Sequence, residues 1–502
     1  MARIKKLAIA NRGEVAVRII HAAQELGIKT ILLHSQVDVG TRAFRMADQT
    51  ICIGPATTAE SYLNIKANVD GALAMGADAV HPGFGFLSEN ADFAEAVIKA
   101  GMIFVGPKPE SIRKLGDKVQ CKKLAEEAGI PLVPGYKGDD QSVSGLKDQA
   151  NKMGYPLIIK AAAGGGGRGM KIIYDPKETE YQIQSAQREA MAAFGSSVVF
   201  LEKYLDKAKH IEFQIFGDSS GKVVHLFDRE CSVQRRHQKI IEEALSPSLP
   251  EELRKKMGQV AELIGSLAGY QGAGTVEFMV QNGEFYLLEV NTRLQVEHPV
   301  TEMVLGMDLV KAQILTAAGE FVFPNDFVRS PRGHAIECRI YAEDPFKDGI
   351  PSTGVLGTVE WPEAYGRRFE YGFEKGDEIT SYYDSMIAKV IVWDENRTRA
   401  LDKMIFTLQN CRIMGVYTNI PLLIEILRHP NFVDGTMTTQ FFSKFFGSHL
   451  KADPLTDDEK FVLEEAQRMF AKSAFTPDQA TGQAPVASPW SGAWSQPGGG
   501  GN

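Results

Sequence analysis

Residues 274–299 read GTVEFMVQNGEFYLLEVNTRLQVEHP. Two apolar runs flank the sequence Gln-Asn-Gly at 281–283, a pattern that is typical of a β-hairpin. Each run carries one glutamate, Glu277 or Glu289, and side-chain alternation puts Asn291 on the same face as Glu289. A loop with an odd number of residues would place the two glutamates directly opposite each other.

Two opposed carboxylates in this hairpin need a counter-charge, because like charges across a sheet destabilise it and buried carboxylates need partners. A hard divalent cation that takes oxygen ligands, Mg²⁺ or Mn²⁺, meets this need. We therefore predict that Glu277 and Glu289 bind a metal ion. The alternative is a solvated hairpin edge, which the apolar neighbours Leu287 and Leu288 disfavour.

A polar face is predicted directly after the hairpin. Arg293, Gln295 and Glu297 stand at alternate positions. A cation, an amide and a carboxylate spaced in this way predict one polar face that binds a small oxyanion.

The length, composition and net charge of the chain limit the class of protein. The chain has 502 residues, of which 44% are hydrophobic, and its net charge is −8. This length predicts about three domains of roughly 150 residues each. The negative charge provides no basic footprint, so no nucleic-acid partner is expected. Five widely spaced cysteines are typical of reduced thiols in the cytoplasm, and no apolar run is long enough to cross a membrane.

The first region, residues 1–115, alternates strands and helices and predicts a doubly wound parallel sheet. The expected strands are 6–10, 30–34, 50–53, 77–80 and 102–105, and the expected helices are 14–26, 61–75 and 90–100. The first turn reads Asn-Arg-Gly-Glu rather than GxGxxG, so nicotinamide binding is not expected. The loop 81–90 follows a strand end, where such sheets bind ligands; a capped turn is the alternative.

The second region, residues 116–330, contains a glycine-rich hairpin. A strand is predicted at 156–161, with Lys160 near its end. Four glycines at 164–167 precede a second strand at 170–174. Glycines allow backbone N–H groups to approach phosphates closely, so we predict a lid over a nucleotide rather than a floppy surface hairpin. Helices are expected at 251–267 and at 302–317, the second capped by Thr301, and strands at 198–200 and 223–227.

The third region, residues 331–446, predicts an α+β domain. Strands are expected at 355–359, 368–371 and 387–393, and helices at 399–407 and 420–427. Residues 447–502 predict one amphipathic helix at 455–472, followed by a Pro- and Gly-rich tail that should be disordered.

Long motifs give the chain a specific resemblance. It resembles the biotin carboxylase family of ATP-grasp enzymes over roughly residues 3–445. The motifs are NRGEVAVR, HPGFGFLSEN, KAAAGGGGRGM, EKYL, DRECSVQRRHQK, TVEF, LEVNTRLQVEHPVTE, ECRIYAEDP, PSTG, YYDSMIAKV and GVYTNIPLL. The resemblance implies a Rossmann-like N-terminal domain, an ATP-grasp domain with its lid at about 132–204, and a C-terminal α+β domain.

The resemblance also implies an activity, ATP- and bicarbonate-dependent carboxylation of biotin through carboxyphosphate. The implied metal ligands are Glu277, Glu289 and Asn291. The implied ATP-binding residues are Lys118, Lys160, Gly164, Gly165, Gly166, Gly167, Glu202, Lys203, Leu205, His210 and His237. Bicarbonate is expected to contact Lys239, Arg293, Gln295 and Val296, with Glu297 as the general base. Arg339 should stabilise the biotin enolate, near Phe84.

Two positions depart from the usual pattern: Ala163 replaces a glycine of the lid, and Phe84 replaces a tyrosine near biotin. The sequence shows no biotin-acceptor motif, so the biotin carrier is expected to be a separate chain. A carboxyltransferase is a further expected partner, and the enzyme is expected to be a homodimer in the cytoplasm.

Two other functions stay open from the sequence. One is an ATP-grasp ligase that activates another carboxylate, which would need no Arg339 and no biotin. The other is a non-catalytic nucleotide-binding scaffold. The complete set of Glu277, Glu289, Arg293, Glu297 and Arg339 argues against a scaffold.

Overall fold

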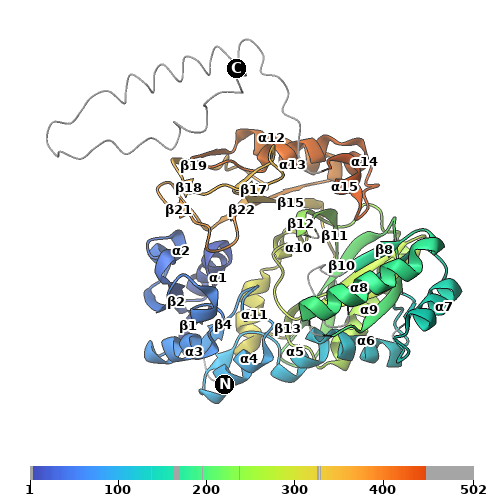
Figure 1. Cartoon of the computed structure of the whole chain (residues 1–502). Coiled ribbons are helices and arrows are strands. Elements are labelled where there is room, and N and C mark those ends of the chain that lie inside the picture. The colour runs from blue at the N-terminus through green and yellow to red at the C-terminus, as the bar shows by residue number, and fades with distance from the viewer. Residues whose placement is uncertain are drawn as a thin grey trace, which may run out of the picture.

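The computed structural model describes residues 4–136, 138–161, 170–194, 196–236, 238–324, 327 and 330–447. The predicted glycines 164–167, His237, the predicted helix 455–472 and the tail therefore lie outside the described residues. Figure 1 shows the N-terminal region in blue and the predicted lid in green on opposite sides of the view, with the C-terminal region in orange above them. Among the described residues, no helix is both long and apolar enough to span a membrane.

The N-terminal region is the expected doubly wound sheet, with five parallel strands in the order β3-β2-β1-β4-β5. Its strands are β1 Lys6–Ile9, β2 Lys29–Ser35, β3 Gln49–Gly54, β4 Ala79–His81 and β5 Ile103–Phe104. Its helices are α1 Gly13–Glu25, α2 Arg42–Met46, α3 Ile65–Ala74, α4 Ala91–Lys99 and α5 Pro109–Gly116. Leu7 and Ile9 enter one core and Ala8 another, as strand alternation requires.

The helix predicted at 61–75 begins later than expected. Residues Thr58–Glu60 form a short 3-10 turn, and α3 starts at Ile65. The Asn64 side chain accepts a hydrogen bond from the Ala67 N–H and so caps the helix.

The predicted lid is a separate four-stranded sheet in the order β6-β9-β7-β8, packed against two helices. Its strands are β6 Gly135–Tyr136, β7 Leu157–Ala161, β8 Met170–Ile173 and β9 Val199–Lys203, and its helices are α7 Val143–Met153 and α8 Thr179–Phe194. A core of its own, including Leu146, Ile159 and Ile183, holds these elements together.

One eight-stranded sheet joins the second and third regions, in the order β14-β13-β10-β11-β12-β15-β22-β20. Its strands are β10 Lys209–Gly217, β11 Val223–Arg235, β12 Gln238–Ala244, β13 Gly272–Gln281, β14 Glu284–Asn291, β15 His334–Tyr341, β20 Arg367–Tyr371 and β22 Met386–Asp394. The prediction that a strand ends at 227 is wrong, because β11 continues to Arg235. Pairing of β12 with β15 carries the sheet across the predicted limit at 330.

Helices cover this sheet. The second region adds α6 Lys118–Glu127, capped by Asp117, and α9 Glu251–Leu267, whose predicted bounds are confirmed. The third region adds α12 Arg397–Asn410, α13 Ile420–Arg428, α14 Pro430–Val433 and α15 Phe441–Phe445.

The single strand predicted at 355–359 is two strands, β18 Gly354–Val355 and β19 Thr358–Glu360. They pair with different partners, β21 Glu378–Ile379 and β23 Arg412–Met414. Leu356 lies between them and is fully buried, so the chain bends there to place this side chain in the core.

The central hairpin opposes Glu277 and Glu289 as predicted, but not through an odd-numbered loop. Gln281 pairs with Glu284 across a two-residue turn, in which Asn282 and Gly283 both have positive φ angles of 55° and 80°. A register shift beyond Phe278, which pairs with Leu287, restores the pairing of Glu277 with Glu289.

The single helix predicted at 302–317 is wrong. The structure has two helices, α10 His298–Leu305 and α11 Leu309–Ala317. Gly306 is left-handed, with φ +65°, and ends α10, while Asp308 caps α11. Thr301 is not a cap; it lies inside α10, where its hydroxyl accepts a hydrogen bond from Arg229.

Candidate active site

A largely buried lysine on β12, Lys239, joins three carboxylates at the centre of the large sheet. Its Nζ donates to Glu212 Oε2 at 2.5 Å, to Glu277 Oε1 at 2.7 Å and to Glu297 Oε1 at 2.7 Å. Glu212 and Glu277 are direct partners in the pairing of β10 with β13. Burial lowers the pKa of Lys239, but the three carboxylates outweigh it and raise this pKa well above its usual value.

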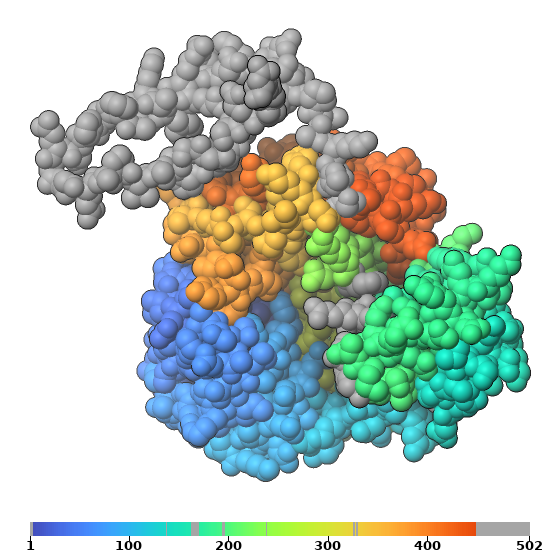
Figure 2. Space-filling view, in the orientation of Figure 1, coloured from blue at the N-terminus to red at the C-terminus, as the bar shows by residue number. Residues whose placement is uncertain are grey.

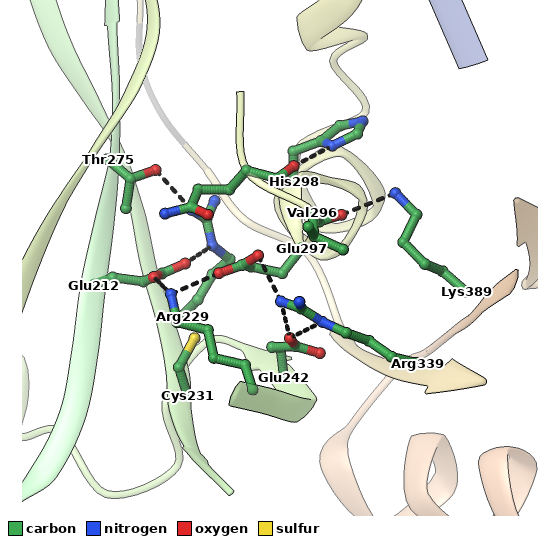
Figure 3. Close-up of polar contacts among 12 residues, drawn as sticks. Glu212, Arg229, Cys231, Glu242, Thr275, Val296, Glu297, His298, Arg339 and Lys389 are labelled. Atoms are coloured by element: carbon green, nitrogen blue, oxygen red, sulfur yellow. Dashed lines mark hydrogen bonds and ion pairs between the residues drawn. The ribbon is translucent and has the colours of Figure 1, made fainter. Parts of the chain in front are cut away.

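Glu297 links Lys239 to Arg339. Its second oxygen accepts a hydrogen bond from Arg339 Nη2 at 2.9 Å, and Arg339 Nε donates to Glu242 Oε1 at 2.6 Å. Figure 3 shows the guanidinium of Arg339 between the carboxylates of Glu297 and Glu242. Burial raises the pKa of Glu297, but Lys239 and Arg339 reverse this and hold it well below its usual value, so Glu297 is ionised.

Both carboxylate oxygens of Glu277 have polar partners. Its Oε1 accepts from Lys239, from Asn291 Nδ2 at 2.9 Å and from Gln295 Nε2 at 3.3 Å. Its Oε2 lies 2.9 Å from His210 Nε2. Burial lowers the pKa of His210, but Glu277 outweighs burial and raises it.

Arg293 extends the same network toward the N-terminal region. Its Nε donates to Glu89 Oε2 at 2.9 Å, and its Nη1 donates to Gln295 Oε1 at 3.0 Å. The predicted oxyanion residues Arg293, Gln295 and Glu297 are therefore close together and connected to Lys239.

The predicted metal ligands provide a donor set that fits Mg²⁺ or Mn²⁺. Glu277 and Glu289 face each other across β13 and β14, and Asn291 adds an amide oxygen on the same hairpin. Glu289 is half-buried, and its Oε2 lies 3.0 Å from Lys118 Nζ. A cavity of about 430 Å³ opens beside this pair and is lined in part by Lys118, Glu289 and Asn291. Bound metal would compete with the donors that now hold Glu277.

The other predicted ATP-binding residues lie on the lid, apart from the Lys239 network. Glu202 accepts a hydrogen bond from Lys122 Nζ at 2.7 Å and also pairs with Lys160. Burial raises the pKa of Glu202, but the two lysines lower it to about 2. Lys203 Nζ donates to the carbonyls of Gly154 and Tyr155, both at 3.1 Å.

The remaining predicted contacts are more dispersed. Leu205 is half-buried beyond the end of β9. The Val296 carbonyl accepts a hydrogen bond from Lys389 Nζ at 2.8 Å, and Lys389 Nζ lies 5.8 Å from the centroid of the Phe84 ring. Figure 2 shows a hollow between the blue N-terminal region and the green lid.

Comparisons with known proteins agree on one family. The family model "Biotin carboxylase, N-terminal domain" matches residues 3–112, "Carbamoyl-phosphate synthase L chain, ATP binding domain" matches 117–322, and "Biotin carboxylase C-terminal domain" matches 337–444. The chain is 46% identical over 446 residues to the biotin carboxylase of Haemophilus influenzae, covering 88% of this chain and 99% of that protein.

The chain belongs to the biotin carboxylase family.

Other relatives of this chain are longer. It is 47% identical to the alpha subunit of mitochondrial methylcrotonoyl-CoA carboxylase from Oryza sativa, but covers 60% of that protein and 88% of itself. The chain thus spans about three fifths of the length of such subunits.

Solved biotin carboxylase structures have the same fold. A biotin carboxylase complex from Campylobacter jejuni matches with a TM-score of 0.83 at 41% identity, covering 88% of this chain and 99% of that one. The biotin carboxylase domain dimer of Hydrogenobacter thermophilus 2-oxoglutarate carboxylase, described in complex with MgADP, ADP and bicarbonate, matches with a TM-score of 0.82 at 43% identity, covering 90% and 100%.

The site includes residues that sequence reasoning did not select. Arg229 is fully buried and donates to Glu212 Oε1 at 2.5 Å and to Gln214 Oε1 at 2.7 Å. A signal for Glu212 existed, because His210, Glu212 and Gln214 alternate along one strand face. For Glu242 the sequence offered only a weaker signal, a charged residue next to a short apolar run.

Proposed function

We propose that this chain catalyses the first half-reaction of a biotin-dependent carboxylase, the ATP- and bicarbonate-dependent carboxylation of biotin. The observation that carries the proposal is that the ionised carboxylate of Glu297 accepts hydrogen bonds from both Lys239 and Arg339. Glu297 thereby connects the proposed bicarbonate site to the proposed biotin site.

Bicarbonate is expected to contact Lys239, Arg293, Gln295 and the backbone of Val296. Glu297 is ionised and takes the proton of bicarbonate. A bicarbonate oxygen then attacks the γ-phosphorus of ATP, the bond to the bridging oxygen breaks, and ADP leaves. The product, carboxyphosphate, divides into CO₂ and phosphate. Phosphate removes the N1 proton of biotin, and the resulting enolate attacks CO₂ while Arg339 stabilises its oxygen.

Mg²⁺ or Mn²⁺ would be held by Glu277, Glu289 and Asn291. When bound, it supplies positive charge to the phosphate oxygens. Lys118 and Lys160 now pair with Glu289 and Glu202, and we propose that both lysines transfer to ATP phosphates when nucleotide binds.

The rest of the ATP site is proposed from the family resemblance. Glu202, Lys203 and Leu205 would hold the adenine, and His210 and His237 would line the nucleotide. The region at about 132–204, including glycines 164–167, would close over it and exclude water from the reactive mixed anhydride.

The proposed partners are a separate biotin carboxyl carrier protein and a carboxyltransferase, and a homodimer is the proposed assembly. The dimeric domain of the Hydrogenobacter relative supports the last point. We also propose domain limits at residues 115, 330 and 446 and a cytoplasmic location; methylcrotonoyl-CoA carboxylase relatives are mitochondrial.

The direct test measures bicarbonate-dependent ADP release with and without free biotin. We expect biotin to raise the rate and carboxybiotin to accumulate. If biotin has no effect while another carboxylate acceptor does, the chain is a different ATP-grasp ligase. If ATP binds but no ADP forms with any acceptor or with the biotin carrier, the chain is a scaffold.

A further inference from the structure

Two fully buried glutamates lie next to Arg339 on the same face of the large sheet. Glu242 on β12 and Glu337 on β15 are direct partners in the antiparallel pairing, so their side chains lie on the same face of the sheet. Arg339 follows Glu337 by two residues and shares that face. The large sheet therefore places two acids, both remote from water, beside the guanidinium that is proposed to contact biotin.

The two acids differ in their partners. Glu242 Oε1 accepts from Arg339 Nε at 2.6 Å. Glu242 Oε2 and both oxygens of Glu337 are buried and have no hydrogen-bond donor among the described residues. A buried carboxylate without donors is far less costly in its protonated form than in its ionised form.

Lys389, the main cation that lowers the pKa of Glu337, is already engaged elsewhere. Its Nζ donates to the Val296 carbonyl at 2.8 Å and forms ion pairs with Glu370 at 2.7 Å and with Glu14 at 3.2 Å. Among the described residues, it makes no hydrogen bond to Glu337.

Burial and the neighbouring carboxylates together outweigh the nearby cations and favour a neutral acid in this pair. Burial raises the pKa of Glu337 well above its usual value; Lys389 and Arg339 oppose this shift, and Glu242 and Glu370 add to it. Burial also raises the pKa of Glu242, to about 7, with Arg339 and Lys239 opposing and Glu297 adding.

We propose that Glu337 is a neutral carboxylic acid in the resting enzyme and that Glu242 is the positioning carboxylate for Arg339. The proposal rests on the proposed function, in which Glu297 accepts a proton from bicarbonate. At that moment Arg339 loses the charge of one of its two carboxylate partners. Glu242 stays ionised and holds the guanidinium in place, while a neutral Glu337 leaves enough positive charge to stabilise the biotin enolate.

Infrared difference spectroscopy at pH 8 tests the protonation of Glu337 without any turnover. The wild-type minus Glu337→Gln spectrum should contain the C=O band of a protonated carboxylic acid, and this band should shift to lower frequency in D₂O. Glu243→Gln is the matched control, because Glu243 is equally buried but is ionised by His334 and Arg397. Its difference spectrum should contain only carboxylate bands.

The absence of an acid band from the Glu337 difference spectrum would overturn the proposal. Failure of Glu337→Gln to fold would also count against it, because the amide is neutral and of the same size. Both results stand even if the protein proves not to carboxylate biotin, so this measurement separates the two proposals.

Kinetics with free biotin test the positioning role of Glu242. Glu242→Gln should lower kcat/KM for biotin at least about tenfold, since a charge-assisted hydrogen bond is lost, and leave the KM for ATP unchanged. Glu242→Asp should recover part of the loss. Wild-type kcat/KM for biotin should fall as the pH drops below about 7, where Glu242 takes up a proton, and this inflection should vanish in Glu242→Gln.

Glu337→Gln should keep kcat/KM within about threefold of wild type at pH 8. An equal loss in the Glu337→Gln and Glu242→Gln variants, or an unchanged kcat/KM in Glu242→Gln, would overturn the assignment of roles.

Discussion

At the residue scale, the site depends on charges that compensate one another out of contact with water. Lys239 contacts three carboxylates, so one positive charge compensates several negative charges that are largely remote from water. The same contacts hold the pKa of Glu297 low, so it is ionised but weakly basic at rest. Substrate that displaces Lys239 or Arg339 from Glu297 would raise its basicity.

Glu297→Gln tests this residue directly. The amide keeps the size of the side chain but cannot take a proton, so we expect ATP affinity near wild type and turnover reduced at least about 100-fold. Nucleotide binding by calorimetry and ADP release provide the two measurements. Glu302→Gln is a matched buried control, paired with Arg18 and Arg368 instead, and should keep most of its turnover. Near-normal turnover of the Glu297→Gln variant would show that Glu297 is not the general base.

The sequence allowed candidate site residues to be selected in the hairpin and in the segment after it, because these residues lie close together along the chain. It did not allow Arg229 or Glu242 to be assigned to the site. Their partners come from strands far apart in sequence, such as Arg339 for Glu242, and only the order of strands in the sheet brings them together.

At the element scale, the hairpin holds Glu277 opposite Glu289 through a tight turn and a register shift together. Two apolar runs flanking a turn predicted both strands, but such runs cannot distinguish an odd loop from an even turn followed by a bulge. The split of the predicted helix 302–317 has a similar cause, because Gly306 and Asp308 are a stop and a start signal within one apolar pattern.

Asn282 offers a test of the turn. Its φ of 55° is tolerated by asparagine and glycine but not by β-branched residues. We expect Asn282→Val to lower the free energy of unfolding by about 1–2 kcal/mol and Asn282→Gly to change it by less than about 0.5 kcal/mol. Urea denaturation measures both. Equal stability of the valine and glycine variants would show that this turn does not determine the hairpin.

At the scale of the whole molecule, the eight-stranded sheet arranges the site. In strand order it carries a charged side chain on every strand: Glu289, Glu277, Glu212, Arg229, Lys239, Arg339, Lys389 and Glu370. Local patterns predicted a Rossmann-like region and two further regions, but not that the last two share a sheet. That feature depends on long-range pairing, such as Ile241 with Cys338, which no local pattern encodes.

Glu14 of the N-terminal region and Lys389 of the C-terminal region meet in the interior, 3.2 Å apart. Burial raises the pKa of Glu14 to about 7, despite Lys389. A folded-state pKa above the unfolded value means that this group stabilises the fold at low pH and that the stabilisation is lost as the pH rises from about 4.5 to 7.

We therefore expect the stability of wild type relative to Glu14→Gln to fall by about 1–3 kcal/mol between pH 5 and pH 8. Chemical denaturation of both proteins at the two pH values measures this difference. A pH-independent difference would contradict the assigned titration.

The origin of the phosphate oxygen tests the central chemistry most directly. The enzyme is supplied with ATP, biotin and freshly dissolved ¹⁸O-bicarbonate, and the inorganic phosphate is analysed by mass spectrometry. We predict that each phosphate formed carries one oxygen from bicarbonate, because that oxygen attacks the γ-phosphorus and remains on phosphate when CO₂ departs. Phosphate whose new oxygen comes from water would contradict the activation of bicarbonate at Lys239 and Glu297.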